Sequence, residues 1–192
     1  VFEVQWIGFW FNIPGVTQDP TLVVNNFIDN GADVIMSGID TTEAIDVSGQ
    51  RAAQGDVVWA VPYDFAGACE QSPDVCLGVP YFNWGPAYLD TALAVQDGTW
   101  VQSWDWNAPN WADLTDNTTT AAGWVNGPAL TPEMQANLDL FIAGLSTGEI
   151  NVWTGPLNLW DGTPYIADGA VATDAEIWYL PALLEGMIGA SE

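Results

Sequence analysis

The sequence has 192 residues but no histidine and no lysine, and Arg51 is its single basic side chain. Against that one cation stand 25 acidic residues, which give a formal net charge of −24. Histidine is the usual acid–base group and metal ligand near neutral pH, so chemistry of that kind is excluded. A charge this negative repels phosphate backbones and anionic lipid. We therefore expect no nucleic-acid partner.

Cysteine is scarce as well, because the chain has only Cys69 and Cys76, which flank a short loop that contains Pro73. A zinc site would need more soft ligands than these two thiols. The pair therefore predicts a local disulfide bond, which would suit an extracytoplasmic compartment. The alternative is a pair of reduced thiols in a cytosolic loop.

Long apolar runs are also missing, and none reaches the roughly 18 residues that a membrane-spanning helix needs. No signal peptide is recognisable, and Val1 already opens what reads as an apolar strand, so we expect a mature or cut product. The length fits one domain, or one lobe of a larger protein with extensions.

Catalytic motifs are missing too, since the sequence has neither a glycine-rich phosphate loop nor a nucleophile motif. A glycosidase could draw on the 25 acids, but the sequence marks out no particular pair of carboxylates. We predict a protein that is not an enzyme and that has no cofactor and no metal. A carbohydrate-active protein is the alternative from another class.

What the sequence does contain is an alternation of short apolar runs with helical segments. Strands are expected near residues 2–8, 32–36, 57–61 and 75–80, and helices near 21–30, 40–54 and 86–96. Such alternation predicts a three-layer α/β unit whose core sheet is parallel and includes the strands near Val4, Val34, Val58 and Val75.

The second half of the chain has a different pattern. We expect a strand near Trp124, a helix over 131–148 and a hairpin turn at Asp161-Gly162. A last helix is expected from Thr173 to Leu184, with a kink at Pro181.

Trp104, Trp106 and Trp111 lie in or beside a long polar connection. They suggest a platform on which a sugar could stack. Spaced tryptophans more often belong to a core or to an interface between lobes, and we favour that second interpretation.

The most informative stretch is Tyr81-Phe82-Asn83-Trp84-Gly85-Pro86-Ala87-Tyr88, which joins an apolar run to a helix. Ligands of open α/β sheets bind at such corners, beyond the carboxyl ends of the strands. Aromatic rings together with Asn83 could hold a flat, polar small molecule. The alternative is an ordinary helix start with Pro86 in the first turn.

Several short segments, spread over nearly the whole chain, share an order and a spacing with one known family. They are Trp6 to Phe11, Gly31 to Ile35, Asn83 to Tyr88, Asp97 to Trp100, Gly148 to Leu157, Asp161-Gly162 and Thr173 to Gly189. In this order they resemble the later part of the basic membrane protein family, the substrate-binding lipoproteins related to the purine nucleoside receptor that serve ABC importers.

The resemblance implies a type I periplasmic-binding-protein-like fold, in which two α/β lobes hold a ligand between them. Residues 1–192 would form the second, C-terminal lobe and its tail, while the first lobe and a lipid-anchored N-terminal part would be missing. The implied function is the extracytoplasmic solute-binding component of an ABC importer, at the periplasm or cell surface. It would bind a nucleoside-like small molecule and pass it to an ABC permease. The alternative is a structural fragment of such a protein that self-associates through its exposed aromatic surface.

The resemblance also implies which residues contact the ligand. Trp10 or Phe11 matches a ring that stacks on a nucleobase, and Asp64 matches an acid that accepts hydrogen bonds from ribose hydroxyls. Asn83 and Trp84 would line the same cleft. Pro62 departs from the family pattern, which usually has glycine there, and this puts the shape of the loop in question.

The positions of these residues along the chain agree with that assignment, because they follow predicted strands and a parallel sheet would bring them to one edge. Asp40 follows the second strand and is a further candidate. For Asp40 we favour the alternative that it caps the next helix. For Trp84, a place in the core is as well supported as a place in the site.

Overall fold

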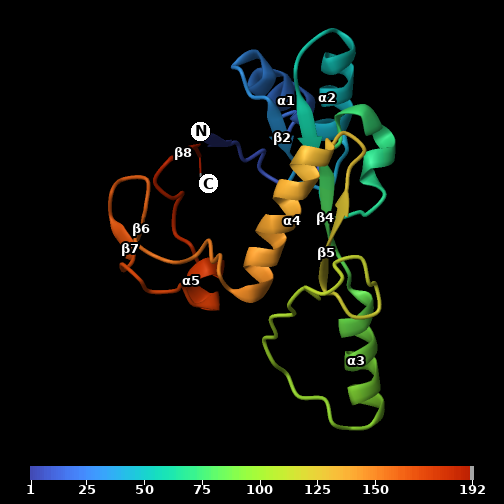
Figure 1. Ribbon diagram of the computed structural model, residues 1–192, viewed down its shortest axis with the longest axis vertical. Coiled ribbons are helices and arrows are strands. Elements are labelled where there is room, and N and C mark those ends of the chain that lie inside the picture. Colours follow the sequence, from blue (N-terminus) through green and yellow to red (C-terminus); the bar gives the residue numbers. More distant parts are fainter. Residues whose placement is uncertain (191–192) are drawn as a thin grey trace.

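The computed structural model describes residues 1–190 as a mixed α/β chain (Figure 1). The helices are α1 (Pro20–Asp29), α2 (Glu43–Ala53), α3 (Gly85–Gln96), α4 (Pro132–Thr147) and α5 (Asp174–Trp178), with short 3-10 helices η1 (Ala68–Gln71) and η2 (Pro73–Val75). The strands are β1 (Phe2–Val4), β2 (Val34–Met36), β3 (Trp59–Val61), β4 (Gly78–Phe82), β5 (Ala122–Asn126), β6 (Leu157–Asn158), β7 (Pro164–Ile166) and β8 (Met187–Gly189).

The best-packed part of the molecule surrounds the parallel pair β2–β3, with α1 and α2 beside it (Figure 1). Apolar side chains from α1, β2, α2 and the residue before β3 form one buried cluster: Val24, Ile28, Ile35, Ala44, Val47 and Val58. A second cluster joins α2 to β3 and β4 through Ile45, Ala60, Val75, Cys76 and Val79. Burial of these side chains is the main force that holds the two parallel strands against their helices.

Arg51 strengthens this region by tying α2 to α1. Its guanidinium forms ion pairs with Asp29 and Asp56 and donates a hydrogen bond to Asn25. The single basic side chain of the protein is therefore fully engaged inside the fold.

The predicted single parallel sheet is wrong in its extent, because the strands within residues 1–190 pair two by two. Of the four pairs, β1–β8 and β2–β3 are parallel, whereas β4–β5 and β6–β7 are antiparallel. The strand near Val4 thus pairs with β8, and Val75 lies in η2 rather than in a strand. Apolar alternation marks a strand but does not specify its partner, which explains the error.

A remnant of the expected parallel arrangement joins β3 to β4. It consists of isolated bridges, Ala60 with Cys76 and Asp64 with Tyr81. Pro80 has no N–H group and therefore cannot donate to a ladder, and proline is typical of strands paired on one side only. The full ladder of β4 is made with β5 instead.

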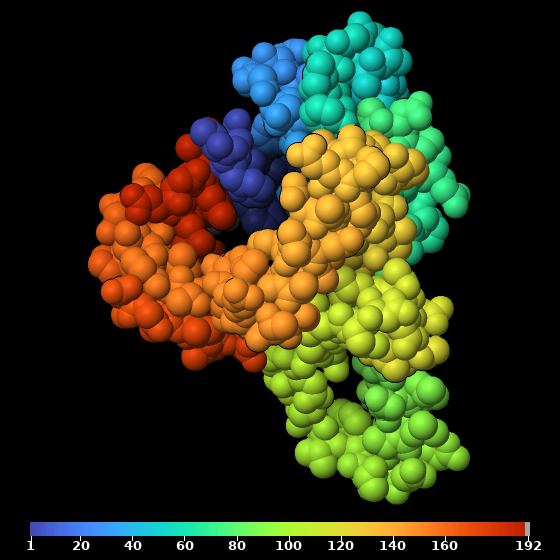
Figure 2. Space-filling model, in the orientation of Figure 1, coloured from blue at the N-terminus to red at the C-terminus, as the bar shows by residue number. Residues whose placement is uncertain are grey.

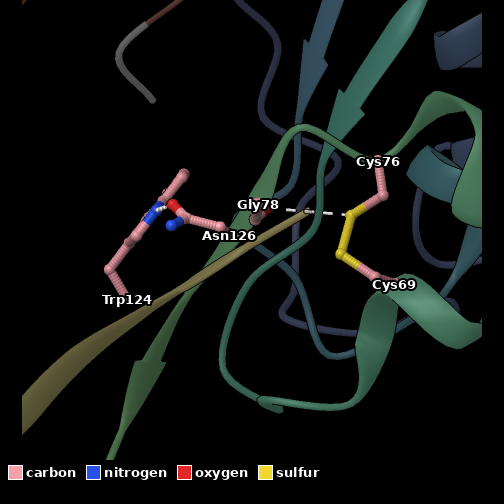
Figure 3. The surroundings of a disulfide bond; sticks show 5 residues. All are labelled: Cys69, Cys76, Gly78, Trp124 and Asn126. Carbon is pink, nitrogen blue, oxygen red and sulfur yellow. Dashed lines mark hydrogen bonds between the residues drawn. A yellow bond between two sulfur atoms is a disulfide. The ribbon is translucent and has the colours of Figure 1, made fainter. Parts of the chain in front are cut away.

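The predicted disulfide between Cys69 and Cys76 is present, and it links η1 to the residue that follows η2 (Figure 3). Cys76 is fully buried, and its Sγ lies 3.9 Å from the carbonyl oxygen of Gly78. Trp124 covers Gly78 so closely that a Cβ atom there would collide with the indole ring. Glycine is therefore required at the start of β4.

Helix α3 forms within the predicted bounds, but it stands out from the body of the molecule together with the chain that follows it (Figures 1 and 2). None of its 12 residues is buried within the described part of the chain. Leu89, Leu93 and Val95 are exposed. The expected amphipathic helix is therefore present without a partner for its apolar side chains in residues 1–190.

The last helix is shorter than predicted, since α5 covers only Asp174–Trp178. Thr173 begins it with a capping box to Glu176, as its sequence suggested. Pro181 ends the helical segment instead of kinking it, because proline disfavours helical geometry in the residue before it. Within residues 1–190, no helix combines the length and apolar character needed to span a bilayer.

Candidate functional site

The chain segments that follow β2 and β3 meet at the carboxyl ends of these two parallel strands. Asp40 comes from the first segment, and Tyr63 and Asp64 come from the second. The Tyr63 hydroxyl donates a hydrogen bond of 2.6 Å to Oδ1 of Asp40. Burial raises the pKa of Tyr63 to about 12, and the hydrogen bond to Asp40 and the charges of Asp40 and Asp64 act in the same direction. The hydroxyl therefore stays protonated and keeps donating.

Asp64 is the residue with the most unusual backbone in this group. Its φ angle is 73°, and it is the one non-glycine residue among 1–190 with a positive φ. Its N–H donates to the Pro80 carbonyl at 2.9 Å, so β4 holds this conformation in place. A strained backbone of this kind is typical of functional positions. The Asp64 carboxylate makes no hydrogen bond within the described chain, so its oxygens are available to a ligand.

The aromatic residues after β1 lie next to Asp40. The Trp10 carbonyl accepts a 2.5 Å hydrogen bond from the Asp40 N–H. The Phe9 ring packs edge-on against both Trp10 and Phe11, with ring centroids 5.7 and 4.9 Å apart. Trp10 is 62% exposed and Phe11 is 45% exposed. Both rings are therefore free to stack on a ligand, and the structure leaves the choice between them open.

Trp84 reaches the same region through a chain of rings. Tyr63 contacts Phe82 edge-on, with centroids 6.2 Å apart, and Phe82 contacts Trp84 at 5.6 Å. Trp84 then stacks on Tyr88 in the first turns of α3. Because 57% of its surface is exposed, Trp84 is not a core residue. It lies at the edge of the site, one ring away from Tyr63.

The Asn83 side chain mainly holds the loop that contains Asn117 and Thr120 in place. Its Nδ2 donates to the carbonyl oxygens of Asn117 and Thr120, at 2.8 and 2.7 Å. Only the side-chain oxygen of Asn83 is left for a ligand, so its predicted role in binding stays a prediction.

The structure therefore brings most of the predicted residues together. A backbone hydrogen bond joins Trp10 to Asp40, and Tyr63 joins Asp40 to Asp64. Phe11 reaches this group through Phe9 and Trp10.

The favoured interpretation of Asp40 as a helix cap is wrong. The N-cap residue of α2 is Thr42, and the Asp40 carboxylate accepts the Tyr63 hydroxyl instead. Two further residues sit between Asp40 and the first residue of α2, so its side chain is too far from the first turn to cap it.

Sequence reasoning gave Tyr63 no role in the site, and it included Phe82 in the aromatic corner without assigning it a contact. Both are aromatic residues at the end of a buried strand, beside residues that were predicted to bind. That position in the sequence could have identified both residues as members of the site. Their contact depends on the isolated parallel bridge between Asp64 and Tyr81, which the sequence does not specify.

The residues of the site are suited to binding rather than to catalysis. They offer carboxylate acceptors, a protonated phenol and exposed aromatic faces. Within residues 1–190 no three His, Cys, Asp or Glu side chains come close enough to hold a metal ion.

The known proteins that this chain resembles are binding proteins. Over 172 residues, or 90% of the chain, it is 30% identical to a purine-binding protein of Brucella abortus, of which it covers 44%. A solved structure, an ABC transporter solute-binding protein from Conexibacter woesei, shares 18% identity and a TM-score of 0.43, with 69% of this chain and 41% of that chain covered. No family model matches the sequence. The chain therefore spans less than half the length of the curated relative it matches.

Proposed function

We propose that this chain is the ligand-binding part of an extracytoplasmic solute-binding protein of an ABC importer, and that its ligand is a nucleoside-like small molecule. The observation that carries the proposal is the meeting of Asp40, Tyr63 and Asp64 beside the exposed rings of Trp10 and Phe11. Similarity to a purine-binding protein supports this class of ligand. The segments that resemble the basic membrane protein family support the role in import.

The chemistry of the site fits the two halves of a nucleoside. A carboxylate with both oxygens available, such as that of Asp64, can accept hydrogen bonds from two adjacent ribose hydroxyls, and charge-assisted bonds are the stronger kind. The exposed face of Trp10 or Phe11 offers a surface on which a base can stack. Tyr63 would keep the Asp40 carboxylate fixed beside the site. No step of this kind makes or breaks a covalent bond, so the proposed role is binding without catalysis.

The second side of the cleft would come from a lobe outside this chain. An open site on one lobe buries little of a ligand, whereas small-molecule sites usually bury 70–90% of the ligand surface. The disulfide between Cys69 and Cys76 favours an oxidising, extracytoplasmic compartment. An ABC permease would then be the partner that receives the ligand.

Calorimetry on the intact protein that contains this chain tests the proposal. Adenosine should bind, and free ribose and free adenine should each bind at least about tenfold more weakly, because each keeps only one half of the contacts. If none of a panel of purine and pyrimidine nucleosides binds, the ligand class is wrong. The 192-residue chain alone should bind adenosine more weakly than the intact protein does.

A second candidate function rests on the surface of α3. The exposed Leu89, Leu93 and Val95 leave apolar area on a helix that buries nothing in the described chain, which favours self-association. Sedimentation of the chain over a range of concentrations distinguishes this role, since a structural fragment should form oligomers whether or not a nucleoside is present.

A further inference from the structure

A second group of aromatic residues, separate from those of the site described above, lines a small open pocket at the surface. The loop after α3 places Trp104 and Trp106 against Trp178 of α5, with ring centroids 5.4 and 5.8 Å apart. The planes of both loop rings are nearly perpendicular to the Trp178 ring, at 75° and 83°. Together with Asp174 and Tyr179 they line a cavity of about 340 Å³. That volume lies at the small end of the range for small-molecule sites.

The α5 side of the cavity is held firmly in place. The Thr173–Glu176 capping box fixes the start of the helix, and the Tyr165 hydroxyl donates to the Glu176 carbonyl at 2.7 Å. The carboxylate of Asp174, by contrast, makes no hydrogen bond within residues 1–190. The cavity therefore combines aromatic walls with one unengaged negative charge.

The wider charge distribution favours a positively charged ligand at this place. The protein carries a net charge of −24, and Arg51, its only basic side chain, is already paired with Asp29 and Asp56. A cation is attracted to the field of such a protein, and the faces of tryptophan and tyrosine rings attract cations more than those of other side chains.

We propose that Trp104, Trp106, Trp178, Tyr179 and Asp174 form a binding site for a small organic cation of the quaternary or methylated ammonium class. Because the Trp104 and Trp106 rings stand nearly perpendicular to the Trp178 ring, the open pocket presents aromatic surface in more than one orientation to a compact, rounded group. A sugar, in contrast, stacks on a single open face. Asp174 supplies the charge that a sugar would not require.

Choline and its neutral isostere 3,3-dimethylbutan-1-ol are the matched probes, because they have the same shape and differ in charge. Titrations of the 192-residue chain, followed by tryptophan fluorescence and by calorimetry, should show choline binding at least about tenfold more tightly than the isostere. Equal binding of the two compounds would overturn the proposal. So would binding of methyl glucoside in the absence of choline binding, which would identify a sugar site instead. This comparison uses the unaltered protein and does not depend on any variant.

Variants then locate the site. The Trp178→Leu change should weaken choline binding at least about tenfold, and Trp178→Phe, which keeps a ring, should weaken it less. The matched control is Trp160→Leu, because Trp160 is equally exposed but does not line the cavity. Far-ultraviolet circular dichroism verifies that each variant is folded. If Trp178→Leu and Trp160→Leu change choline binding to the same extent, the site is not at this cavity.

Discussion

Asp64 combines a carboxylate that is proposed to bind a ligand with a backbone in the left-handed region, and three substitutions can separate these two properties. Its φ of 73° is unfavourable for most residues, but asparagine tolerates this region almost as well as aspartate does, and glycine adopts it freely. Alanine has neither the tolerance of asparagine nor the freedom of glycine, so it is strained at this φ. Asp64→Asn therefore removes the charge and keeps the backbone, Asp64→Gly removes the side chain and relaxes the backbone, and Asp64→Ala removes the side chain and adds strain.

The expected effects on stability and on affinity follow different orders. Asp64→Ala should lower the free energy of unfolding by about 1 kcal/mol through left-handed strain, while the other two variants stay close to the wild type. Adenosine affinity should fall in all three. Loss of hydrogen bonds to a charged group costs about 1.5–3 kcal/mol, which corresponds to roughly tenfold to a hundredfold weaker binding. Asp64→Asn should lie at the low end of that range, because its oxygen still accepts a hydrogen bond.

Urea unfolding measures the stability of each variant, and calorimetry with adenosine on the intact protein measures affinity. Asp90→Asn is a suitable control, since it removes one exposed acid from α3 without touching the site. If adenosine affinity is lost in Asp64→Ala but retained in Asp64→Gly, the backbone and not the carboxylate is responsible. If all three variants bind like the wild type, Asp64 has no role in binding.

Three other predictions concern the stability of the fold. Arg51→Gln should lower the thermal unfolding midpoint, because it breaks the ion pair from α2 to Asp29 of α1 and the ion pair to Asp56 after α2, and scanning calorimetry at low salt measures this. Thr120→Val should destabilise by about 1–3 kcal/mol in urea, because the fully buried Thr120 hydroxyl donates to Ala122 and accepts from Asn110. For Tyr63, whose pKa is raised from 10.0 to about 12, the stabilising contribution should be complete below pH 10 and disappear as the pH rises through about 12. An ultraviolet titration should accordingly show a tyrosine that ionises near pH 12, and this step should be missing in Tyr63→Phe, while the raised pKa of Tyr81, which burial causes, should persist in that variant.

The helices of this protein were predictable because their ends depend on local signals. Gly31, Gly55, Gly98 and Gly148 all adopt positive φ angles just beyond helix ends, at or next to the ends of the expected helix ranges. A glycine stop acts through the backbone of its own turn and needs no distant partner. The same locality explains why the disulfide between two nearby cysteines could be predicted.

The errors concern contacts between distant segments. Apolar alternation looks the same whether a strand joins a large parallel sheet or a two-stranded pair, so the partner of β1 was missed. Spaced tryptophans look the same in a core and on a surface; the exposed Trp104 is not in a core, and a place for it between lobes stays a prediction. The hydrogen bond from Tyr63 to Asp40 is likewise a contact between distant segments, since it forms only when the ends of two strands are brought together.

The pairing of β1 with β8 has a consequence for how the chain acquires its structure during synthesis. Phe2 aligns with Met187 and Val4 with Gly189, so a strand near the start of residues 1–190 pairs with one near their end. Until β8 emerges, β1 has a free edge and an apolar side chain, Phe2, that is still partly exposed in the finished fold. Unpaired edges of this kind are where growing chains associate with one another. The α1–α2 region can form early around β2 and β3, whereas β1 cannot pair until β8 has been made, which makes that interval the time when a chaperone would protect it most.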